Sequence, residues 1–477
     1  MEVRPVKKLR IWIPLILVLV ILTGCLLYRQ RFATVGENRY ERTIESIDLS
    51  GSPVSDLTQL KAFYDLKRID LRGTGVKCEE YEQVKSWFPE AEILWDIPFQ
   101  GEFYDMDTRE LTLTSLTLEE IGVLDYFTEL ESICAEDCAD YENLGILRQR
   151  RPELKLSYKV PLGDTRYSND IKELTLPGEM VEELFTAIPH FRELTSLKLE
   201  EPLAPIDRIL SLREAFPQVE ISWSVNVGGI AADEFTEQLD LTGIPMTVEQ
   251  MEAVLPYLLN VTYIDMTDCG ISNEEMDALN RRHENVKIVW TVDIGPYLRL
   301  RTDATCFMPA KEGIFVRDEA LYNLRYCTDM IAIDLGHMKI TNIDFVAFMP
   351  HLKYLLLCET LVTDLTPLTG LTELVYLELF LTYPKDLSPL LTLTALEDLN
   401  LHYVRGDVDI IARMTWLKNL WWGYNAAMSW DQQQMLREAI PGCNFNFTSF
   451  SSTGGGWREL PNYYAQRDIF GLYYMTG

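Results

Sequence analysis

The chain has 477 residues, a formal net charge of −30 at pH 7 and a sequence pI of about 4.6. Its 47% hydrophobic and 24% charged residues are typical of a folded protein and exclude a disordered chain. The excess of negative charge argues against nucleic acid or an anionic membrane surface as the ligand, because both would repel it.

An apolar segment without charged residues runs from Ile11 to Tyr28, behind basic residues at positions 4, 7, 8 and 10. Its length is just enough to span a bilayer, and the basic flank predicts that the chain after Arg31 lies outside the cell. The segment also contains Leu22-Thr23-Gly24-Cys25, which matches the lipobox of bacterial lipoproteins. We therefore expect residues 1–31 to anchor the chain, as an uncleaved signal anchor or through lipid on Cys25, with free secretion as a third alternative.

Residues 1–31 carry six basic residues and one acidic residue, so the remaining chain has a net charge of −35. Residues 32–43 form a short juxtamembrane linker in this interpretation. The acidic surface is expected mainly to be solvated and to keep a long chain soluble.

A long repeating unit occupies residues 44–295. Each copy has two ordinary strands, such as Ile44-Ile47-Leu49 and Leu66-Ile69-Leu71, and a third strand that ends in an aromatic residue. Between the strands, three pairs of residues have capping-box spacing and predict helices, which should cover the side of the repeats opposite the strands, the convex side of a curved array. The pairs are Thr117 with Glu120, Thr247 with Gln250 and Ser272 with Glu275. The aromatic residues recur at steps of 63, 65 and 67 residues and are expected to fill the core rather than to stack on carbohydrate: Trp95, Tyr158, Trp223 and Trp290.

A regular ladder occupies residues 330–440, after an irregular connecting segment at residues 296–329. Each copy has apolar residues at its first, fourth and sixth positions, which predicts a short strand with one face in a core. Two copies continue into Asp-Leu-x-Pro-Leu, at residues 364–368 and 386–390. The copies begin 22, 22, 22 and 21 residues apart, and such a period predicts a solenoid: Met330, Leu352, Leu374, Leu396 and Leu417.

This pattern resembles the 22-residue repeats of internalin-like bacterial leucine-rich repeat proteins. The resemblance covers about residues 44–447, although the ninth position, usually Asn in the family, holds Met338, Thr360, Thr382 and Val404. It implies an α/β leucine-rich repeat solenoid with a parallel sheet on the concave face and short helices and turns on the convex face. It also implies protein ligands. Residues 441–477, with an aromatic tail, are expected to form a C-terminal cap.

The candidate site is the concave face of the C-terminal strands, whose outward residues combine aromatic area with a few polar groups. Parallel pairing should place Leu356, Glu378, Asn400 and Trp421 in one column. An equally weighted alternative is that the C-terminal tail folds back and covers this face as a cap. The predicted binding residues are Tyr354, Leu356, Tyr376, Glu378, Phe380, Asp398, Asn400, His402 and Trp421.

Other chemistry is sparse in the sequence. An interrupted acidic column suggests a hydrated face, with calcium or a basic peptide as the minor alternative: Asp48, Asp70, Asp240, Asp265 and Asp334. The nine cysteines have no zinc or disulfide spacing, so free thiols are expected, with a Cys306–Cys327 bridge as the alternative. Only five histidines are present and no catalytic motif is found, so we expect no enzyme, no cofactor and no metal.

These observations predict a non-catalytic leucine-rich repeat protein at the bacterial cell surface that binds an extracellular or envelope protein. One alternative is a structural scaffold of the cell envelope. Another is an extracytoplasmic hydrolase, because pairs of carboxylates are abundant.

Overall fold

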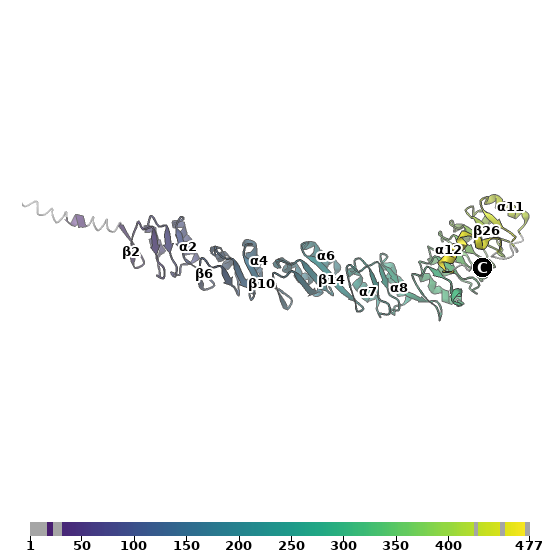
Figure 1. Cartoon of the computed structure of the whole chain (residues 1–477), viewed down its shortest axis with the longest axis horizontal. Coiled ribbons are helices and arrows are strands. Elements are labelled where there is room, and N and C mark those ends of the chain that lie inside the picture. The colour runs from purple at the N-terminus through teal and green to yellow at the C-terminus, as the bar shows by residue number, and fades with distance from the viewer. Residues whose placement is uncertain (1–16, 22–30, 424–427, 449–453, 473–477) are drawn as a thin grey trace, which may run out of the picture. The chain divides into compact units, whose positions relative to one another are not determined.

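The computed structural model describes residues 17–21, 31–423, 428–448 and 454–472 (Figure 1). The chain divides into two compact units, Met1–Ser222 and Trp223–Gly477. Most of the predicted membrane anchor, including Cys25, lies outside the described residues, and residues 17–21 are helical. Within the described part of the chain, no helix has the length and apolar character needed to span a membrane.

The first unit contains short parallel strands that carry the predicted apolar ladder on their inner face. One sheet comprises β3, β4 and β5, and the next has the order β8-β9-β10, while β12 pairs with β13. In β10 the burial alternates strictly along the strand, as expected for a sheet with one face in a core. The strands are β3 (Ser46–Asp48), β4 (Arg68–Asp70), β5 (Glu92–Leu94), β8 (Glu110–Thr112), β9 (Ser132–Ala135), β10 (Lys155–Leu162), β12 (Glu173–Pro177) and β13 (Ser196–Glu200).

Antiparallel hairpins, which the sequence analysis did not predict, precede the parallel strands of each long unit. Each of the first four has a two-residue turn with a glycine at positive φ, as at Gly36, Gly101, Gly163 and Gly228. Such turns match the natural twist of a hairpin and favour glycine. The pairs are β1 (Phe32–Val35) with β2 (Asn38–Glu41), β6 (Asp96–Phe99) with β7 (Glu102–Asp105), β10 with β11 (Thr165–Ser168), and β14 (Glu220–Val227) with β15 (Ile230–Asp233).

Helices of the long units lie between their strands, and the three predicted capping boxes are confirmed at Thr117, Thr247 and Ser272. At each, the hydroxyl accepts the N–H of the third helical residue, whose side chain accepts the N–H of the cap. The helices are α2 (Cys78–Trp87), α3 (Leu118–Val123), α4 (Tyr141–Arg150), α5 (Val181–Ala187), α6 (Ile206–Ala215), α7 (Val248–Val254) and α8 (Asn273–Arg282), with 3-10 turns η1 (Leu57–Ala62), η2 (Leu124–Tyr126), η3 (Gly178–Met180), η4 (Ile188–His190) and η5 (Leu255–Tyr257).

The second unit contains a three-stranded parallel sheet, a fifth hairpin and a seven-stranded parallel sheet. The three-stranded sheet comprises β16 (Gln238–Asp240), β17 (Tyr263–Asp265) and β18 (Lys287–Val289), and the hairpin pairs β19 (Thr291–Asp293) with β20 (Arg299–Arg301). The large sheet runs in chain order through β21 (Cys306–Phe307), β22 (Ala332–Asp334), β23 (Tyr354–Leu356), β24 (Tyr376–Glu378), β25 (Asp398–Asn400), β26 (Asn419–Trp421) and β27 (Asn444–Asn446).

One segment has more regular structure than the sequence indicated. Residues 296–329, expected to be irregular, contain β20, the first strand of the large sheet and α9 (Asp318–Leu321). The last strand of the large sheet, β27, lies at the end of the resemblance to the repeats, which reaches about residue 447. The other elements of this unit are η6 (Pro309–Glu312), η7 (Tyr322–Tyr326), η8 (Asp344–Phe348), η9 (Thr366–Leu368), η10 (Ser388–Thr392), α10 (Val408–Ala412), α11 (Trp430–Ala439), η11 (Trp457–Glu459) and α12 (Pro461–Ile469).

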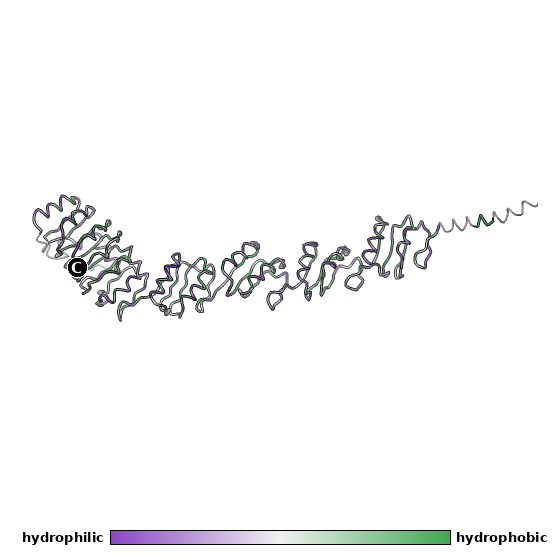
Figure 2. The backbone as a smooth tube through the Cα atoms, turned by 180° about the vertical axis from the view of Figure 1, so that it is seen from behind, coloured by the Kyte–Doolittle hydropathy of each residue, from purple (hydrophilic) through white to green (hydrophobic). Residues whose placement is uncertain are grey.

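The 22-residue ladder forms the core of the large sheet, where hydrophobic residues alternate with polar ones along the coils (Figure 2). Met330, Leu352, Leu374 and Leu396 are fully buried, and Leu417 is 3% exposed. The Asp-Leu-x-Pro-Leu segments form η9 and η10, each with an aspartate oxygen that accepts the backbone N–H two residues later. Repeating coils of strand, turn and short helix define a leucine-rich repeat fold.

The recurrent aromatic residues of the long units pack in the core, as predicted. Trp95, Tyr158, Trp223 and Trp290 are at most 4% exposed. Trp223 Nε1 donates a hydrogen bond to the carbonyl of Tyr257 at 2.8 Å, and Trp95 stacks on Tyr81 at 4.3 Å between ring centroids. Buried and engaged in this way, these rings have no free face for a sugar.

Candidate functional site

The predicted column is confirmed in the register of the seven-stranded sheet. Leu356 pairs with Glu378, Glu378 with Asn400, and Asn400 with Trp421. The structure therefore brings the candidate residues together on one face, as parallel stacking at a constant repeat length requires. The outward side chains of β23 to β26 form what we call the aromatic face, consisting of Tyr354, Leu356, Tyr376, Glu378, Phe380, Asp398, Asn400, His402 and Trp421.

The aromatic face is buried in this structure. All nine side chains are at most 8% exposed. Residues 454–472, which we call the C-terminal cover, lie over part of it, because Leu460, Tyr463 and Ile469 pack against the buried cluster that contains Tyr376 and Trp421. The sequence left two possibilities for this face, an exposed binding site or a surface covered by the C-terminal tail. The structure shows the covered surface.

The indole of Trp457 is the centre of the cover. It lies 5.2 Å from the rings of both Tyr376 and Trp421, measured between centroids, and is 1% exposed. Phe470 joins the same buried cluster. Aromatic side chains stabilise such contacts through large buried area and tilted ring packing.

A glycine run positions this indole. Gly455 and Gly456 have φ values of +65° and +85°, which disfavour other residues. A Cβ on Gly455 would also collide with the amide of Asn446, on the last strand of the sheet. Trp421 Nε1 donates a hydrogen bond to the carbonyl of Gly454 at 2.9 Å. The glycine run thus forms a turn that fits closely against the sheet.

Glu378 is the polar centre of the aromatic face. Its carboxylate accepts a hydrogen bond from Trp457 Nε1 at 2.7 Å and another from the hydroxyl of Tyr376. Burial raises the pKa of Glu378, and these two hydrogen bonds oppose the increase. The carboxyl group therefore binds the cover directly, across 79 residues of sequence.

Asp398 lies on the neighbouring strand. Its Oδ1 accepts a hydrogen bond from Asn419 Nδ2 at 2.7 Å. Burial raises the pKa of Asp398 as well. Two carboxyl groups under one aromatic cover make this the most polar part of the buried face.

His402 and Asn400 support the backbone beneath the face. Asn400 Oδ1 accepts the N–H of His402 at 3.1 Å, and His402 Nδ1 accepts the N–H of Gly423 at 3.2 Å. Both side chains are fully buried. Their hydrogen bonds hold the backbone that follows β25 and β26 in place, so these two side chains have a structural role.

The predicted acidic column has a structural explanation in turn chemistry. Each aspartate of this column accepts the backbone N–H two residues later. Asp48 accepts the N–H of Ser50 at 2.9 Å, and Asp240 accepts the N–H of Thr242 at 3.0 Å. Such Asx turns let the chain leave a strand with its first free N–H satisfied. The same bond is made by Asp70, Asp265 and Asp334.

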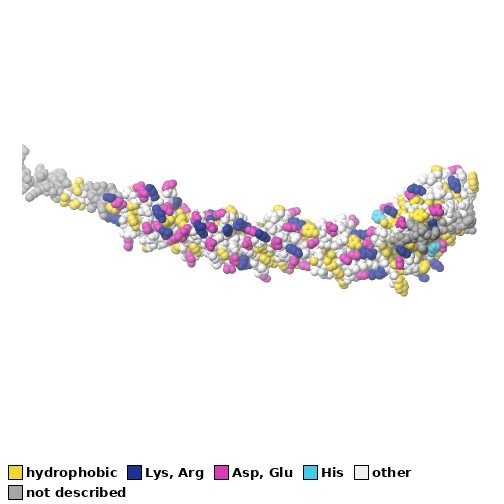
Figure 3. Space-filling view, viewed as in Figure 1, with side chains coloured by type: hydrophobic (Ala, Val, Ile, Leu, Met, Phe, Trp, Pro, Cys, Tyr) yellow, Lys and Arg dark blue, Asp and Glu magenta, His cyan; other side chains and the backbone are white. Residues whose placement is uncertain are grey.

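Charged side chains elsewhere are interspersed. Figure 3 shows acidic and basic residues mixed over the visible surface of the long units. Several face each other across neighbouring strands, as in Arg109 with Glu131 at 3.0 Å and Lys67 with Glu45 at 2.9 Å. Among the described residues, no group of three or more histidine, cysteine, aspartate or glutamate side chains could hold a metal ion.

The eight described cysteines are free thiols, so Cys306 and Cys327 are not bridged. Cys134 on β9 is exposed, whereas burial raises the pKa of the Cys327 thiol to about 12. Cys306 packs against the cluster beneath the cover, and burial raises its pKa too. Cys327 is buried and Cys306 is half-buried, and a raised pKa keeps both thiols protonated and weakly reactive.

No protein-family model matches the chain, and no curated protein matches it by sequence. Solved structures are similar to it. The internalin InlF of Listeria monocytogenes shares 12% identity over 87% of this chain and 91% of that chain, with a TM-score of 0.26. A leucine-rich repeat protein of Leptospira interrogans shares 14% identity over 85% of this chain and 96% of that chain, with a TM-score of 0.24.

Internalin C2 of Listeria monocytogenes shares 22% identity over 30% of this chain and 72% of that chain, with a TM-score of 0.23. The leucine-rich repeat fold of the present chain is carried by its own coils: the buried ladder, the in-register parallel sheet and the turns between them. Its class is therefore that of an α/β leucine-rich repeat protein.

Proposed function

We propose that this chain is a non-catalytic, protein-binding leucine-rich repeat protein and that the aromatic face is its binding site. The observation that carries the proposal is the way in which the face holds residues 454–472. An indole fills the space between Tyr376 and Trp421, and its N–H is received by Glu378. Buried aromatic anchors with one oriented polar contact are the features of a protein-binding hot spot.

In this proposal the cover is a resident occupant, and a partner takes its place with a segment of similar chemistry. That segment presents an indole or a comparable aromatic group to Glu378 and a backbone carbonyl to Trp421 Nε1, as Trp457 and Gly454 do. The partner must compete with a covalently attached segment, whose effective concentration is high. Binding then depends on how easily the cover is released.

A peptide in trans tests the face. A labelled peptide with the sequence of residues 454–472 should bind the full-length Trp457→Ala protein, whose own cover is weakened, more tightly than the parent protein. Adding Trp421→Ala to that protein should abolish binding, as should replacing the tryptophan of the peptide by alanine. Equal binding to all proteins, or none to Trp457→Ala, would argue against the aromatic face as a recognition site.

Capture from envelope and host-surface extracts tests the function itself. The Trp457→Ala protein should retain a partner better than the parent, and further substitution of Tyr376 by alanine should release it. Equal retention by all three proteins would move the site elsewhere. A partner from the same membrane would indicate an envelope scaffold, and no partner at all would contradict the binding function.

We also propose that residues 1–31 hold the protein at the outer face of the bacterial cell membrane. The support is the uncharged segment from Ile11 to Tyr28 behind a basic flank, together with the lipobox that ends at Cys25. Fractionation and protease treatment of whole cells check the location. Metabolic labelling with a fatty acid separates the two anchors. A lipoprotein should incorporate the label and lose it in Cys25→Ala, whereas a single-pass protein should incorporate none in either form.

A further inference from the structure

Among the residues that the structure describes, the fifth hairpin differs from the four before it. The first four have two-residue turns, whereas β19 and β20 are joined by five residues, 294–298, closed by a hydrogen bond from the N–H of Ile294 to the carbonyl of Leu298 at 2.7 Å. This longer loop carries Tyr297 away from the strands. A loop enlarged at one copy of a repeat is a common place for function.

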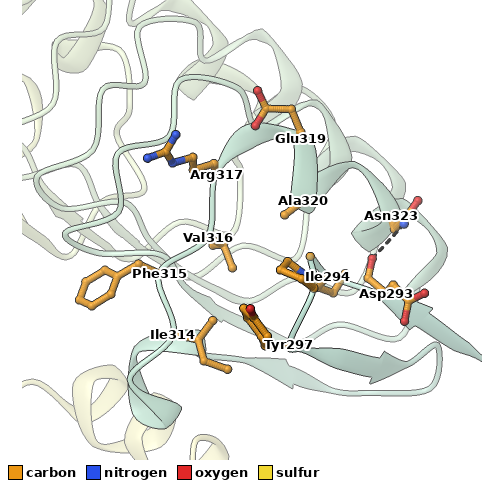
Figure 4. A pocket seen from close by; sticks show the side chains of 12 residues that line it. Asp293, Ile294, Tyr297, Ile314, Phe315, Val316, Arg317, Glu319, Ala320 and Asn323 are labelled. Atoms are coloured by element: carbon orange, nitrogen blue, oxygen red, sulfur yellow. Dashed lines mark hydrogen bonds between the residues drawn. The ribbon is translucent and has the colours of Figure 1, made fainter.

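Tyr297 is 89% exposed and Phe315, in the segment before α9, is 76% exposed. These are the two most exposed large hydrophobic side chains among the described residues. Both line one cavity of about 520 Å³ (Figure 4). Large aromatic side chains left in water at the same opening are typical of a protein interaction site rather than of ordinary surface.

The floor of the cavity is apolar and firmly supported. Ile294 and Val316 are 1% and 5% exposed, and Ala320 on α9 lies between them in Figure 4. Asn323 Nδ2 donates a hydrogen bond to the carbonyl of Asp293 at 2.9 Å, which ties the hairpin to the segment opposite. The cavity therefore offers an aliphatic side chain a preformed place.

The rim is predominantly acidic. Asp293 and Glu319 line the cavity beside a single lysine or arginine, Arg317. Glu319 also lines the adjoining hollow, together with Asp318 and Asp344. Asp293 is already paired with Arg299 at 3.1 Å, so the excess negative charge lies on the α9 side.

Asp318, in the adjoining hollow, keeps its negative charge next to this rim. Burial alone would raise its pKa, but its carboxylate accepts hydrogen bonds from the hydroxyl and N–H of Thr341 and from the N–H of Asn342, and together they lower the pKa. An apolar floor with an acidic border matches an apolar side chain flanked by cations, which can also lie over the aromatic rings.

We propose that this cavity is a second docking site, which takes a protein segment bearing an aliphatic side chain flanked by lysine or arginine. It lies on the fifth hairpin and α9 and does not use the aromatic face. Occupancy therefore needs no release of the C-terminal cover.

Four nine-residue peptides test the proposal, with leucine or serine at the centre and three lysines or three glutamates on the flanks. Fluorescence anisotropy with the full-length protein should detect binding of the leucine–lysine peptide and at least tenfold weaker binding of the other three. Phe315→Ala and Glu319→Lys should each weaken that binding at least tenfold. Phe235→Ala, at a phenylalanine that is 67% exposed elsewhere in the second unit, is the matched control and should change nothing.

Equal binding of all four peptides, absence of binding, or preference for a serine or glutamate peptide would overturn the proposal. So would equal loss in the Phe235→Ala control. The Trp457→Ala protein should bind the leucine–lysine peptide as the parent does. This result would show that peptide binding at the cavity does not depend on the aromatic face, so the two proposals can fail independently.

Discussion

The strands of the long units and of the seven-stranded sheet have the same apolar ladder on their inward face. Their outward faces differ in exposure to water. On β12 and β13 the outward residues include Thr175 and Lys198, which are exposed to water. At the corresponding positions of the large sheet, Glu378 and Trp421 are buried beneath residues 454–472.

The difference shows which parts of a repeat are fixed by folding. The inward positions must be apolar in every copy, because they form the core. The outward positions are free to be polar where water covers them, or aromatic where another segment does. The cover of the large sheet is thus the feature that distinguishes the two regions, and removing it is the most direct way to test the comparison.

Trp457→Ala should have the largest effect. Loss of the buried indole leaves a cavity between Tyr376 and Trp421 and removes a donor from Glu378. We expect the second unit to lose about 3–5 kcal/mol of unfolding free energy. Urea unfolding and hydrogen exchange at β23 to β26 measure this. Trp430→Ala, at an exposed tryptophan, should cost less than about 0.5 kcal/mol, and an equal loss would contradict the role of the cover.

The pH dependence of the second unit comes next. Burial raises the pKa of Glu378 above its ordinary value of 4.5, so the folded state favours the protonated group. Its contribution to stability is complete below that ordinary value and is lost as the pH rises through the folded-state pKa. Glu378→Gln should therefore flatten the fall in melting temperature as the pH rises above 4.5. If the melting temperature of Glu378→Gln depends on pH as that of the parent does, other groups cause the dependence. Asp398 is one such group, because burial raises its pKa as well.

The alkylation rate of Cys306 should show whether the C-terminal cover is closed over the sheet. Cys134, on an uncovered strand, should react with iodoacetamide in the native protein, whereas Cys306 under the cluster should be protected. Trp457→Ala should raise the alkylation rate of Cys306 by about tenfold, because local opening exposes the thiol. Mass spectrometry of the modified peptides gives both rates. Cys134 is the internal control, and its rate should stay constant.

The smallest effect on stability is expected for substitutions on the exposed outward faces of the long units. Thr175→Ala should change the free energy of unfolding by no more than about 0.5 kcal/mol, since the side chain is exposed and no segment that the structure describes covers it. Chemical denaturation of the first unit measures it. A loss comparable with that of Trp457→Ala would mean that the two kinds of face do not differ as described.

Much of the fold could be predicted from the sequence because it depends on local periodicity. The ladder from Met330 to Leu417, the capping box at Thr247 and the column through Glu378 all follow from residue spacing. The buried aromatic at the end of each long unit, such as Trp223, also follows from its constant place in the repeat.

The hairpins and the details of the cover could not be predicted so readily. The hairpins have a local signal, a glycine at a two-residue turn such as Gly163, but this signal was hidden by the stronger ladder around it. The contact between Trp457 and Glu378 joins residues 79 positions apart, and no periodicity encodes such a distance. Composition indicated a cap, but only the fold shows which side chains it meets.

The hairpins also bear on how successive long units are joined. Each long unit opens with its own antiparallel pair, and β5 and β18 are the last strands of their parallel sheets and end before the next hairpin begins. β10 and β14 instead continue without a break from the parallel sheet into the hairpin that follows. The chain therefore contains two kinds of joint. A cut after β5 or β18 would leave the parallel pairing intact, whereas a cut within β10 or β14 would remove strand pairs on both sides.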